Sequence, residues 1–351
     1  MTHRFNSILT ALAAAALFGA ATPLAKTLLG SMSAFMVAGL FYLGSGLGLG
    51  VAIVIRRLRD TAQNNSQKIN RAEVPWLLGA IAAGGVAGPA LLMLGLSSTP
   101  AATSSLLLNL EGVLTAVIAW VVFKENVDTE IVLGMIAIVA GGVLLSWRSG
   151  DQGISVGALL IVGACVCWAI DNNLTRKVST NDAMVIASLK GLIAGSVNLT
   201  IALLSGAKLP GALTVSAAMV TGLAGYGVSL VLFVIALRNL GTARTGAYFS
   251  VAPLFGVALS LVLWPELPGV SFWLAAALMA AGIWLHVRER HEHAHAHERL
   301  EHAHRHRHDE HHQHEHDFPY AGHEPHTHPH VHLPITHTHA HFPDVHHRHS
   351  H

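Results

Sequence analysis

Long apolar runs, separated by short polar or turn-forming stretches, dominate the first 290 residues. Because the hydrocarbon core of a bilayer is about 30 Å thick, a helix needs about 20 apolar residues to cross it. Ten such runs occur, at 6–29, 33–55, 74–97, 100–123, 130–147, 155–177, 183–204, 212–237, 243–263 and 269–287. The first is too long for the apolar core of a signal peptide. The pattern predicts an all-α integral membrane protein with ten transmembrane helices.

Composition divides the chain in two. Over all 351 residues, 52% are hydrophobic and 12% charged, whereas soluble domains average about 25% charged residues. An ordinary soluble enzyme is thereby excluded. Residues 291–351 differ, because they hold 24 of the 26 histidines and nine acidic residues. We expect residues 288–351 to form a disordered, His-rich, low-complexity tail that builds no core.

The basic residues predict the orientation in the membrane. If the N-terminus is inside, 13 Lys and Arg side chains fall on the inner side, and only Lys26, Arg148 and Lys208 fall outside. Such an excess is typical of the cytoplasmic side. We therefore expect a plasma (inner) membrane protein with both termini, and the tail, in the cytoplasm.

The two halves of the membrane segment repeat one another. Leu17–Lys26 aligns with Cys167–Arg176 at an offset of 150, and Ala101–Glu125 aligns with Thr242–Glu266 at an offset of 141. The predicted repeats, 1–147 and 153–287, hold five spans each. Since five is odd, the second copy must be inverted, which is the architecture of many secondary transporters.

These features resemble the drug/metabolite transporter superfamily, specifically proteins with two EamA domains. The resemblance covers about 1–287. It is carried by Phe18–Gly19 and Trp168–Ala169, each followed by a basic residue, by the terminal acids Glu125 and Glu266, and by Ser250–Leu259 (SVAPLFGVAL). One departure is Gly112, where the family pattern has the proline that Pro253 supplies. The resemblance implies a ten-helix exporter with a central cavity, and it names no substrate.

Three charged residues lie well away from the ends of the predicted spans, where a charge is costly and usually faces a cavity or a partner: Glu111, Asp171 and Lys190. Glu111 is at the middle of the fourth span, on a mostly polar stripe with Ser104 and Thr115. It is interpreted either as a cavity carboxylate that binds a cationic group or a proton, or as an acid bonded to a neighbouring helix.

Asp171 and Lys190 each lie ~10 Å from the inner ends of adjacent spans, so they could meet as a buried ion pair. Such a pair is either a structural staple or part of a cytoplasmic gate. Four further residues are candidates for the substrate cavity by position, with packing as the alternative: Asn109, Asn172, Trp168 and Tyr226.

Small residues give weaker signals. Gly pairs at spacing four, such as Gly46/Gly50 and Gly191/Gly195, permit close helix contact. We interpret them as packing, with a homodimer face as the alternative. Cys165 and Cys167 point to different sides of one helix and are interpreted as small packing residues.

The tail alternates histidine with Glu, Ala, Arg, Thr and Pro. Neutral imidazole binds Zn, Ni, Cu and Co, so the tail is interpreted as a divalent-metal binder. The alternative is a pH-responsive solubilising tail. The proposed ligands are His291, His293, His295, His297, His302, His304, His306, His308, His311, His312, His314 and His316.

Three functions follow. The first is a secondary exporter of a small, amino-acid-like metabolite, whose tail regulates it or buffers metal. The second is a Ni, Co or Zn exporter whose tail collects ions, and the third a membrane-anchored metal store or sensor. We find no nucleotide-binding loop or catalytic constellation. We therefore expect no enzyme activity and no required cofactor, and the expected partners are lipid, substrate and metal rather than nucleic acid.

Overall fold

The computed structural model describes residues 2–59, 70–123, 129–147, 154–175, 178, 182–240, 245, 248–265 and 267–288, and four stretches of the tail at 292–297, 300–306, 326–332 and 335–340. The chain forms two compact units, Met1–Arg288 and Glu289–His351. Each is described by itself.

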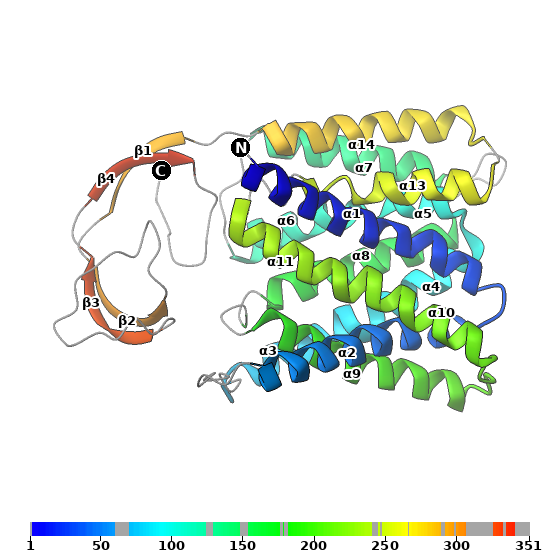
Figure 1. The fold of residues 1–351 in the computed structure, drawn as a ribbon. Coiled ribbons are helices and arrows are strands. Elements are labelled where there is room, and N and C mark those ends of the chain that lie inside the picture. The colour runs from blue at the N-terminus through cyan, green and yellow to red at the C-terminus, as the bar shows by residue number, and fades with distance from the viewer. Residues whose placement is uncertain are drawn as a thin grey trace. The chain divides into compact units, whose positions relative to one another are not determined.

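The first unit is a bundle of apolar helices (Figure 1). Its first half contains α1 (Thr2–Leu28), α2 (Ala34–Arg59), α3 (Val74–Ala80), η1 (Ile81–Ala87), α4 (Gly88–Ser98), α5 (Ala101–Leu107), α6 (Leu110–Phe123) and α7 (Thr129–Ser146). Its second half contains α8 (Val156–Thr175), α9 (Ala183–Leu204), α10 (Ala212–Gly222), η3 (Leu223–Val228), α11 (Ser229–Leu240), α13 (Ala252–Leu263) and α14 (Val270–Arg288).

Eight helical stretches among the described residues are long and apolar enough to cross a membrane. Two shorter apolar helices, Ala252–Leu263 and Val270–Leu285, follow them. The prediction of an all-helical membrane unit agrees with these stretches. The count of ten spans stays a prediction, since the last two helices are shorter.

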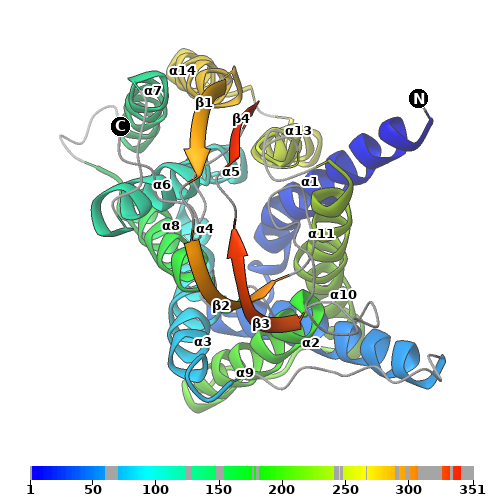
Figure 2. The same ribbon diagram turned by 90° about the vertical axis from the view of Figure 1, so that its left-hand side faces the viewer.

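Helix packing repeats when the two halves are exchanged. Helix α1 packs against α11 and α13 of the second half, and α8 packs against α4 and α6 of the first half. Two further pairs join corresponding helices, α2 with α9 and α7 with α14. Figures 1 and 2 place these two pairs at opposite edges of the bundle. This is the pairing expected from two halves related by a two-fold exchange.

Glycines bring α2 and α9 into close contact. A Cβ atom at Gly46 would lie 2.5 Å from the backbone nitrogen of Leu192, and one at Gly195 would lie 2.6 Å from that of Leu43. These distances are shorter than van der Waals contact, so only glycine fits. The interpretation of these glycines as packing residues is confirmed, and the dimer alternative loses its support from them.

Two pairs of helix irregularities recur at the same offset. The π-helix η3 begins 142 residues after the π-helix η1, and each interrupts a membrane-length helix. The turn at Leu108–Asn109, between α5 and α6, has a counterpart 142 residues later at Ser250–Val251, before α13. Both halves therefore carry the same departures from regular helix, and such departures are frequent at functional sites.

The described tail forms strands, which differs from the disorder expected from the sequence. Strand β1 (Glu292–His297) pairs antiparallel with β4 (Ile335–Ala340), and β2 (Leu300–His306) pairs antiparallel with β3 (His326–His332). The reason is the alternation of histidine with other residues, because a period of two is the period of a strand. Register places histidine opposite histidine at 293/339, 295/337, 302/330, 304/328 and 306/326. The proposed ligands His291, His308, His311, His312, His314 and His316 lie outside the described residues.

Candidate functional site

The candidate site is built around the first π-helix. The backbone carbonyl of Gly84, in η1, accepts a hydrogen bond from the Tyr42 hydroxyl of α2 at 2.9 Å. It accepts a second from Trp168 Nε1 of α8, also at 2.9 Å. A π turn changes the usual helical pairing of N–H and C=O groups, and here side chains from two other helices fill the gap. Trp168, a sequence candidate, is therefore a structural partner of η1.

Asp171 and Lys190 form an ion pair beside Gly84, as the sequence suggested. Their side chains are 7% and 18% exposed, so the pair is shielded from water. Thr175 Oγ1 donates to the second carboxylate oxygen of Asp171 at 2.9 Å. A Cβ atom at Gly84 would overlap the Asp171 carboxylate, so a glycine is required at this point.

Glu111 lies in the first turn of α6, just after the turn that breaks the fourth span. Asn172 Nδ2 of α8 donates to Glu111 Oε1 at 3.0 Å and to Thr115 Oγ1 at 3.3 Å. The polar stripe of α6 thus faces α8. Among the residues that the structure describes, no basic side chain forms an ion pair with Glu111.

Tyr226, the fourth residue of η3, belongs to a group of aromatic rings. Its ring centroid lies 5.4 Å from that of Tyr42, 5.8 Å from that of Phe41 and 6.0 Å from that of Phe18. Phe249 lies 5.5 Å from Phe18 and extends the group. We refer to Phe18, Phe41, Tyr42, Tyr226 and Phe249 as the aromatic group.

The structure thus brings together most residues singled out from the sequence. Glu111 is within electrostatic range of Asp171, Lys190, Tyr42 and Tyr226. Asp171 is paired with Lys190, so Glu111 is the carboxyl group of the described site that has no basic partner. An arrangement of this kind favours the binding of a cation.

Asn109 is the exception among the candidates. Its amide donates to the carbonyl of Leu106 at 2.9 Å and lies 3.8 Å from Met279 Sδ on α14. It therefore caps the break in the fourth span, and no hydrogen bond joins it to Glu111.

Tyr42 and the phenylalanines of the aromatic group were not predicted as site residues. A signal existed for Tyr42, because the chain has only four tyrosines and this one lies within an apolar run. For the phenylalanines no signal existed, since phenylalanine is an ordinary residue in a membrane helix.

The described residues give no support for a metal path through the bundle. Among them, no three His, Cys, Asp or Glu side chains lie close enough to hold one ion. Cys165 is buried, with its Sγ 3.7 Å from the carbonyl of Leu107, and Cys167 is also a free thiol. Both agree with packing roles.

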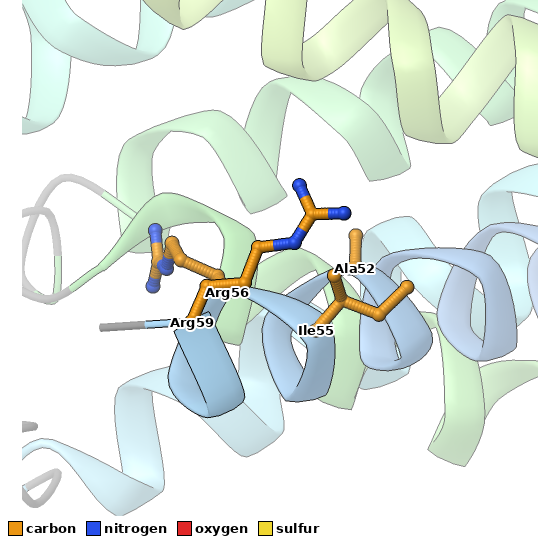
Figure 3. A pocket seen from close by; sticks show the side chains of 4 residues that line it. All are labelled: Ala52, Ile55, Arg56 and Arg59. Atoms are coloured by element: carbon orange, nitrogen blue, oxygen red, sulfur yellow. The ribbon is translucent and has the colours of Figure 1, made fainter. Parts of the chain in front are cut away.

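A separate cavity of about 380 Å³ lies at the end of α2 and contains none of the predicted site residues. Ala52, Ile55, Arg56 and Arg59 line it, and Figure 3 shows both guanidinium groups projecting from the helix end. Arg56 Nη2 also forms an ion pair at 2.5 Å with Asp182, whose carboxylate accepts from the Met184 backbone N–H at the start of α9. Partial burial raises the pKa of Asp182, but these two hydrogen bonds and the Arg56 charge outweigh it and hold that pKa below its ordinary value.

Comparisons with known proteins agree with this architecture. The model of the EamA-like transporter family matches residues 5–147 and 155–288. The chain is 27% identical over 306 residues to an uncharacterized transporter of Methanothermobacter thermautotrophicus, covering 81% of this chain and 86% of that protein. It is 24% identical over 233 residues to the uncharacterized transporter YyaM of Bacillus subtilis, covering 62% of this chain and 74% of that protein. A protein of known crystal structure shares the fold, with a TM-score of 0.57 and 20% identity over 80% of this chain and 96% of that chain.

Proposed function

Because this chain belongs to the EamA-like transporter family, we propose that it is a secondary transporter that exports a small organic metabolite by alternating access between its two halves. The observation that carries the proposal is the polar site at the helix breaks. Charged and hydrogen-bonding side chains meet inside apolar helices, where they are costly unless they face a substrate path or each other.

Each polar element has a role in this proposal. Glu111 contacts the substrate or the coupling ion, since it is a carboxyl group without a basic partner among the described residues. Asp171 and Lys190 hold α8 and α9 together on one side of the path. The exchange of helix partners between halves supplies two similar packings between which the bundle switches.

The test is the composition of the growth medium. Cells that express the full chain, Glu111→Gln or Glu130→Gln are compared by mass spectrometry of the medium. Glu130 is the matched control, because it is an exposed glutamate at the start of α7. We expect one class of organic compound to accumulate with the full chain and with Glu130→Gln but not with Glu111→Gln. Identical media from all strains would contradict export.

We further propose that the tail binds Zn, Ni, Co or Cu, and that it either regulates transport by the bundle or buffers the metal. The support for metal binding is the register of both strand pairs, which places histidine opposite histidine. Neutral imidazole is a common metal ligand. Export of Ni, Co or Zn by the bundle is the second candidate function, favoured by the tail alone. A membrane-anchored metal store or sensor is the third.

Cellular metal content separates metal export from the other two candidates. Cells would express the full chain, a chain that ends at Arg288, or Glu111→Gln, and grow in excess Ni, Co or Zn. A regulatory or buffering tail predicts metal retained only by chains that carry the tail, whatever residue 111 is. If cellular metal content falls in cells that express the full chain but in neither variant strain, the bundle exports metal and the first function is wrong.

The proposed orientation places both termini in the cytoplasm of a cell with the chain in its plasma membrane. The support is the excess of basic residues on that side of the predicted spans. A fluorescent protein fused after His351 is expected to fold and fluoresce there. An alkaline phosphatase fusion at the same point is expected to be inactive, and the reverse pattern would contradict this orientation.

A further inference from the structure

Two basic side chains that the structure describes inside the bundle, Lys26 and Lys190, are already engaged, which restricts the charge of a substrate. Lys190 is paired with Asp171. Lys26, near the end of α1, donates from Nζ to the carbonyls of Leu96, Ser97 and Thr99 at 2.5, 3.1 and 3.1 Å. It thus caps the end of α4. Neither side chain is free to receive a substrate carboxylate without first giving up these partners.

Glu111, in contrast, has acceptor capacity to spare. A carboxylate has about four lone-pair sites, and Asn172 is its one hydrogen-bonding side-chain partner among the described residues. Glu111 can therefore accept further hydrogen bonds from a protonated amine, and it can attract a quaternary amine by charge alone.

The aromatic group provides the second half of a recognition site. Tyr42 connects it to the polar part, since its hydroxyl binds Gly84 while its ring lies 5.4 Å from that of Tyr226. Tyr226 and Phe18 are partly exposed rather than sealed in the core. Aromatic faces attract cations and also pack against apolar or aromatic bodies.

The geometry points to an organic cation as the substrate: a protonated or quaternary amine whose charge pairs with Glu111 and whose apolar, preferably aromatic, body packs on the aromatic group. This inference rests on the proposed transport function and names its substrate class. It differs from a zwitterionic amino acid, since none of the basic side chains that the structure describes inside the bundle is free to receive the carboxylate. It also differs from a bare metal ion, which needs several ligands, because Glu111 is the one carboxylate of the described site that is not already paired with a basic side chain.

Binding to the purified full chain tests the inference. Three probes share one aromatic body and differ in charge: phenethylamine, 2-phenylethanol and 3-phenylpropionate. We expect only the amine to bind at pH 7, measured by isothermal titration calorimetry in detergent. Butylamine, which has the charge without the ring, is expected to bind at least tenfold more weakly than phenethylamine.

Variants assign the two contacts. We expect Glu111→Gln to weaken amine binding at least tenfold and Tyr226→Leu to weaken it several-fold. Glu111→Asp, which keeps the charge, is expected to retain most binding, and Glu130→Gln is expected to bind as the unaltered chain does. Since Glu111→Gln could misfold, each variant is compared at equal monodispersity in gel filtration.

Three results would overturn the inference: equal binding of the alcohol or the carboxylate, unchanged amine binding by Glu111→Gln, or no binding of any probe. The proposed function fails separately. If the exported compound found in the medium is anionic or neutral, transport stands and the organic-cation inference falls. If no compound is exported while the amine binds, the proposed export function falls and the organic-cation site stands.

Discussion

The two π-helices occupy the same place in the two halves, yet their surroundings differ. In η1 the fourth residue is Gly84, and its carbonyl is bound by two side chains while a carboxylate packs against its Cα. Asn198 of α9 also reaches the next two carbonyls, at 3.3 and 3.4 Å. In η3 the fourth residue is Tyr226, and rings take the place of hydrogen bonds.

The contrast shows how a duplicated backbone acquires two chemistries. A glycine in one copy leaves room for an indole, a phenol and an ion pair, whereas a tyrosine in the other fills the equivalent space with its own ring. The irregular backbone is shared, and the fourth residues of the two π-helices, Gly84 and Tyr226, have polar and aromatic neighbours respectively. The proposed substrate, an organic cation with an apolar body, combines the same two chemistries.

The strongest test of this contrast removes the Asp171–Lys190 ion pair, which lies beside η1 and has no counterpart among the described residues beside η3. Lys190→Met leaves the buried Asp171 carboxylate without its partner, which typically costs about 3 to 5 kcal/mol of folding free energy. The double variant Asp171→Asn/Lys190→Met is expected to recover part of that loss. Thermal unfolding of the purified chains measures both. A single variant as stable as the unaltered chain would show that the pair is not shielded as described.

The next test adds one methyl group to the polar side. Gly84→Ala places a Cβ atom on the Asp171 carboxylate, and overpacking of this kind costs about 1 to 3 kcal/mol. Gly112→Ala is the matched control, because nothing lies within 4 Å of the Cβ atom it would add. We expect Gly84→Ala to lower the melting temperature and to abolish transport, and Gly112→Ala to do neither. Equal behaviour of the two variants would refute the close approach at Gly84.

A smaller effect is expected from the hydrogen bonds to the Gly84 carbonyl. Tyr42→Phe or Trp168→Phe removes one of two donors to the same oxygen, at a cost of about 1 kcal/mol each. The double variant is expected to cost more than the sum, because the buried carbonyl then has no side-chain donor. Thermal unfolding of the four chains forms a double-mutant cycle. Strict additivity would argue that the two donors act independently.

The smallest effect concerns the end of α2, outside both π-helices. Because the pKa of Asp182 is lowered in the folded chain, its contribution to stability is present above the unfolded pKa and is lost as the pH falls through the folded pKa. Asp182→Asn is therefore expected to be slightly less stable at neutral pH and equal to the unaltered chain in strong acid. Both Arg56 and Asp182 are about 40% exposed, so the difference is small and shrinks in high salt. A difference that grows in acid would contradict this sign.

Sequence reasoning predicted the parts that depend on local pattern. Apolar runs gave the membrane helices, and the internal repeat gave the two halves that the family model matches separately. Asp171 and Lys190 were predicted to meet because a short loop joins their helices. Their pairing followed from chain geometry alone.

The parts that depend on distant contacts were not predictable. A π turn in η1 or η3 adds one residue to a turn without changing the apolar character of the run, so hydropathy does not reveal it. Tyr42 and Tyr226 are 184 positions apart and meet only after the halves pack. The strands of the tail were not predicted for a different reason, because the alternation of histidine with other residues was interpreted as a flexible set of metal ligands rather than as the period of a strand.

The most direct measurement of the central claim is the efflux of N,N,N-trimethylphenethylammonium, a permanent cation that does not leak through bilayers, from vesicles containing the full chain. We expect efflux well above that of empty vesicles for the unaltered chain and for Glu130→Gln, and background efflux for Glu111→Gln. Efflux by Glu111→Gln at the unaltered rate, or none by the unaltered chain, would contradict an organic-cation path that passes Glu111.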